Sequence, residues 1–143
     1  MTRHHALLTF MLLYGAASLT HFLHNSLYLQ LYPNMPIWLT PLGVLAAWLV
    51  VAGTGVIGYW LYRKGWSVVG LAVIAVYAAS GFAGLDHYTL APVSAHSLAM
   101  NATIGGEVVT ATVLLVVIAG LLVTGPGSPG QPSQRTAPEA ARQ

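Results

Sequence analysis

The chain has 143 residues, of which 56% are hydrophobic and only 6% are charged. Soluble domains carry about 25% charged residues, so this sequence has too little polar surface for a water-facing exterior, whereas lipid suits it. The absence of cysteine excludes disulfides, thiolate metal sites and cysteine nucleophiles. The five basic residues are dispersed and form no stripe, which excludes a nucleic-acid-binding surface.

The first of four apolar segments extends from about Ala6 to Leu31. A transmembrane helix needs roughly 20 mainly apolar residues, and this segment exceeds that length. Pro33 and Pro36 follow it and stop the helix because proline has no backbone donor. The start of the chain also resembles a signal peptide, but the apolar run continues too far, so we interpret it as an uncleaved first span.

Three further apolar segments predict a second, third and fourth span. Pro41 is a favourable first-turn residue for the second span, and Ser94 is the expected N-cap of the fourth. The four predicted spans are 6–31, 41–62, 66–85 and 94–123. They predict an all-α protein, a four-transmembrane-helix bundle whose membrane domain covers residues 1–124. Residues 125–143 are rich in Gly, Pro, Ser and Gln and are predicted to form a disordered tail.

Small residues recur every four positions in two of the spans. Such spacing lets helices approach closely in lipid. The residues concerned are Ala75, Ala79 and Ala83, then Gly43 and Ala47, then Ser80 and Gly84. Either these rows are packing faces, or alanine and glycine are simply common in the chain.

The basic residues predict the orientation of the bundle. With four spans, all five fall on one side, whereas the loops 32–40 and 86–93 contain no Lys or Arg. Basic residues favour the cytoplasmic side, so both termini are predicted to be cytoplasmic. We therefore expect a multi-pass protein of the cell (inner) membrane, with the lipid bilayer as its main partner. The basic residues are Arg3, Arg63, Lys64, Arg135 and Arg142.

Polar side chains gather near the opposite, outer face. Four of the six histidines fall in this layer, and they come from three different spans. Glu107 lies on the same face of the fourth span as His96, about 16 Å deeper at 1.5 Å per residue. Ionisable groups inside a membrane are costly, which makes Glu107 a functional candidate.

Imidazole and carboxylate groups from converging helices are suitable ligands for a transition metal. The candidate ligands are His21, His24, His87, His96 and Glu107, and Asp86, Asn25 and Asn101 are candidates to orient them by hydrogen bonds. Two facing histidines also suit a haem, with His21 or His24 opposite His87 or His96. The haem would be non-covalent, because the chain has no CxxCH motif. The alternative is that these polar residues serve only the membrane interface and contacts between helices.

Three functions remain open from the sequence. The first is a metal- or haem-binding membrane protein or oxidoreductase. The second is a proton- or cation-coupled transporter subunit, with a path through His21, Glu107 and the outer histidines; four spans are few for a transporter, so it would form a homo-oligomer. The third is an accessory subunit of a larger membrane complex.

Overall fold

The computed structural model of the protein describes residues 3–125, which form helices and connecting loops without any β-strand. Four segments are long and apolar enough to cross a membrane, namely Arg3–Leu27, Pro41–Arg63, Ser67–Leu90 and Leu98–Val123. The all-α class and the four membrane-length helices are therefore confirmed. The elements are α1 (Arg3–Leu27), η1 (Leu29–Leu31), α2 (Pro41–Arg63), α3 (Ser67–Ala79), η2 (Ser80–Asp86), α4 (His87–Leu90), η3 (Val93–Ala95) and α5 (Leu98–Val123).

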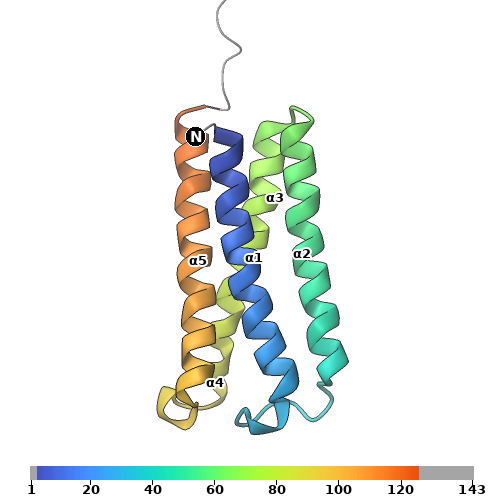
Figure 1. The fold of residues 1–143 in the computed structure, drawn as a ribbon, viewed down its shortest axis with the longest axis vertical. Coiled ribbons are helices and arrows are strands. Elements are labelled where there is room, and N and C mark those ends of the chain that lie inside the picture. Colours follow the sequence, from blue (N-terminus) through green and yellow to red (C-terminus); the bar gives the residue numbers. More distant parts are fainter. Residues whose placement is uncertain (1–2, 126–143) are drawn as a thin grey trace, which may run out of the picture.

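The four spans stand side by side as one bundle (Figure 1). α1 packs against α2 and α5, and α3 packs against the same two helices. Arg3 Nη1 donates to the Gly125 carbonyl oxygen at 2.8 Å, so the first and last described residues meet at one end. We call this the terminal end; it also carries the turn between α2 and α3. The opposite loop end carries the segments 28–40 and 87–97.

The interior of the bundle changes character along its length. From the terminal end to the middle it is an apolar core, made of Leu7, Met11, Tyr14, Tyr62, Leu71, Ile74, Tyr77, Ala78, Ala111, Leu114 and Ile118. Toward the loop end, buried polar side chains join the apolar ones, namely Ser18, His21, Asn25, Ser26, His87, His96 and Glu107. This division places the predicted polar layer inside the bundle rather than on its lipid-facing surface.

The ends of three spans differ from the predicted ones. α1 ends at Leu27, and residues 29–31 form a separate 3-10 turn instead of prolonging the helix. The third span changes from α to 3-10 geometry at Ser80 and then continues to Leu90, beyond the predicted end at residue 85. Only the second span, Pro41–Arg63, has nearly the predicted limits, because Thr40 caps its first turn by accepting from Gly43 N at 3.1 Å.

Ser97, not Ser94, is the N-cap of α5. The Ser97 hydroxyl accepts a hydrogen bond from Met100 N at 3.2 Å, whereas Ser94 lies within the 3-10 turn Val93–Ala95. His96 and Ser97 have extended backbone, which separates that turn from the helix. The predicted tail lies outside the described residues, apart from Gly125.

Glycines, rather than the predicted rows of small residues, make the closest helix contacts. Most residues of the predicted rows are exposed or only partly buried, and the exposed ones are Gly43, Ala47, Ala79 and Ala83. Gly84 is the one member of these rows that is buried. The tight approach joins α2 to α3: a Cβ on Gly58 would lie 2.8 Å from Ile74 Cγ1, and a Cβ on Gly70 would overlap the Tyr62 backbone. Spacing did not reveal these positions because the spans are apolar on every face, so the pattern does not mark the inward side.

Substitution of Gly70 by alanine is expected to lower the thermal stability of the detergent-solubilised protein. The new methyl group has no room against the Tyr62 backbone, and such overpacking costs about 1–3 kcal/mol. Gly53→Ala is the matched control, since nothing lies within 4 Å of its added Cβ. Melting curves followed by circular dichroism compare the two, and equal midpoints would contradict the α2–α3 packing.

Candidate functional site

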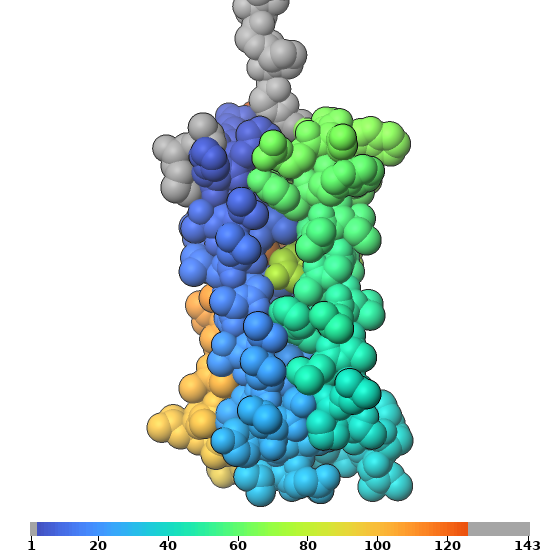
Figure 2. All heavy atoms as spheres, turned by 45° about the vertical axis from the view of Figure 1, so that its right-hand side comes forward, coloured from blue at the N-terminus to red at the C-terminus, as the bar shows by residue number. Residues whose placement is uncertain are grey.

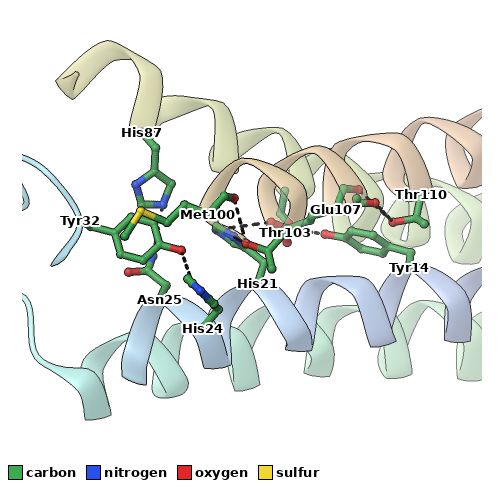
Figure 3. Close-up of polar contacts among 12 residues, drawn as sticks. Tyr14, His21, His24, Asn25, Tyr32, His87, Met100, Thr103, Glu107 and Thr110 are labelled. Carbon is green, nitrogen blue, oxygen red and sulfur yellow. Dashed lines mark hydrogen bonds and ion pairs between the residues drawn. The ribbon is translucent and has the colours of Figure 1, made fainter. Parts of the chain in front are cut away.

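A buried pair of ionisable side chains lies at the border between the apolar core and the polar interior. His21 of α1 and Glu107 of α5 face each other, with 3.8 Å between His21 Nε2 and Glu107 Oε2 (Figure 3). The two residues are only 3% and 1% exposed. Within residues 3–125, the other acidic residue is Asp86, which is exposed, and the basic residues of the bundle lie at the terminal end. The pair therefore has to balance its own charge.

The hydrogen bonds around His21 decide which of its nitrogens carries the proton. The Thr103 hydroxyl donates its one hydrogen to the Met100 carbonyl oxygen at 3.0 Å. It can therefore only accept from His21 Nδ1, which lies 3.4 Å away. If the imidazole is neutral, Nε2 therefore carries no hydrogen, and its lone pair is directed at the Glu107 carboxyl. This tautomer is assigned from the hydrogen-bond network. A lone pair and a carboxylate oxygen attract each other only when a proton or another cation lies between them.

His87 and His96 continue from this pair toward the loop end. The His87 ring centroid is 5.4 Å from that of His21, and the His96 centroid is 6.1 Å from that of His87. Asn25 Nδ2 donates to His87 Nε2 at 3.2 Å. His96 Nδ1 donates to the Pro92 carbonyl oxygen at 3.1 Å, which leaves its buried Nε2 as a free acceptor. The three imidazoles thus form a file that leads from the loop end to Glu107.

The other predicted site residues lie outside this file. His24 is bonded through Nδ1 to the Tyr32 hydroxyl at 2.8 Å and is not directed at the pair. Asp86 is exposed. Asn101 accepts from the Tyr88 hydroxyl at 2.9 Å and donates to the His96 carbonyl oxygen at 3.2 Å, so it holds the loop that carries His96.

Several residues of the site were not among the predicted ones. Ser18 and Tyr14 lie on the same face of α1 as His21, a spacing that was visible in the sequence, and Tyr14 OH is 3.2 Å from Ser80 Oγ. Tyr32 comes from the loop, and its ring centroid is 4.8 Å from that of His87. Burial raises the pKa of the Tyr32 hydroxyl, so this ring covers His87 as a neutral group.

Four buried polar atoms of this region have no hydrogen-bond partner within the described part of the chain: Ser18 Oγ, Asn25 Oδ1, His96 Nε2 and Glu107 Oε2. Buried polar groups in folded proteins are nearly always paired. These four atoms all belong to the cluster of buried polar side chains near the loop end.

The predicted metal ligands do not converge on one point. Among residues 3–125, no three His, Asp or Glu side chains are arranged to hold a metal ion. His21 and Glu107 approach as a pair, while His87 and His96 follow at ring separations of 5.4 and 6.1 Å. The metal or haem centre stays a prediction.

Comparison of the chain with protein-family models, with curated proteins and with solved structures finds no match in any of the three. The function has to be inferred from the geometry of the site.

The 3-10 segment η2 forms the wall of the site opposite His21 and Glu107. A Cβ on Gly84 would lie 3.2 Å from Glu107 Oε2 and 3.8 Å from His21 Nε2. A Cβ on Gly81 would lie 2.8 Å from both Tyr14 Cε2 and Ala111 Cβ. The two glycines therefore let the third span approach α1 and α5 where the polar groups meet.

Substitution of Gly84 by alanine is expected to displace the Glu107 carboxyl, because the methyl group would lie closer to Oε2 than ordinary van der Waals contact allows. The chain contains two glutamates, Glu107 and Glu139, so carboxyl NMR of ¹³C-glutamate-labelled protein resolves the effect. The Glu107 signal should shift in Gly84→Ala and stay in place in Gly106→Ala, whose added Cβ meets nothing within 4 Å. If the chemical shift of Glu107 is the same in Gly84→Ala as in the wild type, η2 does not form this wall.

Proposed function

We propose that the protein is a proton-coupled transport subunit of the cell (inner) membrane, in which His21 and Glu107 bind the coupled proton. The observation that carries the proposal is the 3.8 Å approach of His21 Nε2 to Glu107 Oε2 in a buried site, with His21 Nδ1 lying 3.4 Å from the Thr103 hydroxyl. Two facing acceptors form a favourable pair only with one added proton. Intramembrane carboxyl and imidazole groups in pumps and transporters serve as such proton sites.

The file of histidines supports a route from the loop end to this pair. An imidazole accepts a proton on one nitrogen and releases another from the opposite nitrogen, which suits it to stepwise transfer. His96 Nε2 is a free acceptor near the outer loop, and His87 stands between it and His21. The ring centroids of consecutive histidines are 5.4 and 6.1 Å apart, so the three imidazoles are close neighbours along this route.

The apolar half of the bundle supports closure of the site on its other side. Leu7, Leu71, Ile74, Leu114 and Ile118 are buried together between the pair and the terminal end. Aliphatic side chains give a proton no acceptor. A coupled carrier binds its ion from one side while the other is closed, and this arrangement fits such a state.

A transition-metal centre has less support than a proton site. His21 and Glu107 would supply two ligands, and no third His, Asp or Glu joins them among the described residues. Zinc sites in proteins use three or four protein ligands. The shared proton, by contrast, needs no partner beyond the two side chains already in place.

The proposal includes an orientation. The terminal end carries Arg3, Arg63 and Lys64, and we place it in the cytoplasm by the positive-inside rule, with the loop end and the histidine file on the outer side. In this orientation the route receives protons from outside the cell.

Glu107→Gln and His21→Gln are expected to abolish proton uptake. The purified protein is reconstituted into liposomes that contain a pH-sensitive dye, and a potassium gradient with valinomycin drives protons inward. Loss of a proton-transfer group lowers the rate by about 100-fold or more. Asp86→Asn, which removes an exposed carboxylate of the outer end, is the matched control and should leave the rate unchanged.

Two results would overturn the proposal. One is proton uptake in Glu107→Gln at the wild-type rate. The other is a stoichiometric metal in the purified wild-type protein that His21→Gln removes, because this would identify a metal centre at the same residues.

The orientation can be tested with single cysteines, since the chain has none of its own. Gln30 lies exposed at the loop end and Trp66 lies exposed beside the α2–α3 turn. In intact cells, a membrane-impermeant maleimide should label Gln30→Cys, and it should label Trp66→Cys only after permeabilisation. The reverse pattern would place the termini outside.

A further inference from the structure

A groove opens between α1 and α2 on the lipid-facing side of the bundle. Its volume is about 450 Å³, within the range of about 300–1,000 Å³ that ligand pockets occupy. Leu8 and Ala16 line it on α1, Ala52 and Tyr59 on α2, and the Tyr77 ring forms its floor. Figure 2 shows this hollow, with part of the third span visible between the two helices.

The floor of the groove is fixed by glycines. A Cβ on Gly15 would lie 2.9 Å from the Tyr77 hydroxyl, and a Cβ on Gly55 would lie 2.9 Å from Tyr77 Cδ1. The Tyr77 ring is therefore held between α1 and α2, and its edge contact with Tyr14, at a centroid distance of 4.7 Å, supports it from behind. The base of the groove is closely packed, and the side chains that line it on α1 and α2 include the small Ala16 and Ala52.

A basic side chain and a histidine stand beyond the terminal end of this groove. Arg63 lies four residues after Tyr59 on α2, and His4 lies four residues before Leu8 on α1, so each continues the row of its lining residue about 6 Å further along the helix. Arg63 is exposed, and His4 packs on the Tyr62 ring with a centroid distance of 5.1 Å. An apolar channel thus leads to a rim whose charge comes from Arg63.

We propose that this groove binds one anionic phospholipid of the leaflet at the terminal end. One acyl chain lies in the groove over Tyr77, and the phosphate group pairs with Arg63, whose planar guanidinium suits phosphate oxygens. The charge of the rim selects the headgroup, and the apolar lining accepts the chain. A second copy of the protein fits less well, because a parallel neighbour would bring its own cationic end against this one. The proposal does not depend on proton transport.

Native mass spectrometry of the detergent-purified protein, titrated with phosphatidylglycerol or phosphatidylcholine of the same chain length, tests the site. The wild type should retain one phosphatidylglycerol in preference to phosphatidylcholine. Arg63→Gln should reduce that preference by about fivefold, the effect of removing one basic residue near an anionic headgroup. Ala52→Leu should abolish retention of both lipids by filling the groove. Ala119→Leu, which adds the same side chain on the exposed face of α5, is the matched control and should bind like the wild type.

Equal retention of the two lipids by the wild type would overturn the proposal, and so would full phosphatidylglycerol binding by Ala52→Leu. A dimer in the wild-type spectrum that Ala52→Leu dissociates would assign the groove to a second copy instead. If Ala52→Leu fails to fold, Arg63→Gln still decides the matter, since its substitution is on the surface.

Discussion

The structure depends on keeping one carboxyl group inside a membrane bundle. An ionised side chain at the centre of a bilayer costs roughly 3 kcal/mol even on the mildest scales, so Glu107 has to be neutral or paired. His21 supplies the partner at 3.8 Å, and this requires α1 and α5 to pack side by side. The third span meets the pair through Gly84, where any larger residue would press on the carboxyl. Glu107 thus lies where α1, α5 and the 3-10 segment of the third span meet.

The division of the interior into an apolar and a polar half separates stability from function. Leu71, Ile74 and Leu114 are buried together in the apolar core of the terminal half, which holds the helices against one another. The loop half contains histidines, amides and hydroxyls with unmatched bonding capacity, which would weaken an ordinary core. Such a half can persist because the apolar half holds the helices in register. Apolar contacts elsewhere in the same four helices offset the stability that is lost at the polar site.

Hydropathy predicted the fold class and the number of spans, because a run of about twenty mainly apolar residues is typical of a transmembrane helix. Helical spacing also placed His21, His87 and His96 in one layer with Glu107 beneath it. In the structure, successive ring contacts connect the three histidines, and His21 approaches Glu107. Helical spacing could not exclude His24 from the site, because His24 lies on the neighbouring stripe of the same helix. Its hydrogen-bond partner is a loop tyrosine, and helical periodicity does not predict contacts with a loop. The change to 3-10 geometry at Ser80 was equally hidden, since it follows from the fit of glycines against another helix.

The hydrogen bond between Arg3 and the Gly125 carbonyl has a topological consequence. The four spans form a closed cycle, in which α5 returns to lie beside α1. A short linker could join residues 3 and 125, and the chain could be opened at Gly65 in the turn between α2 and α3. Such a circular permutant would retain every helix neighbour, and its new termini would leave the bundle from the same end. The order of the helices along the chain is thus separable from their arrangement in space.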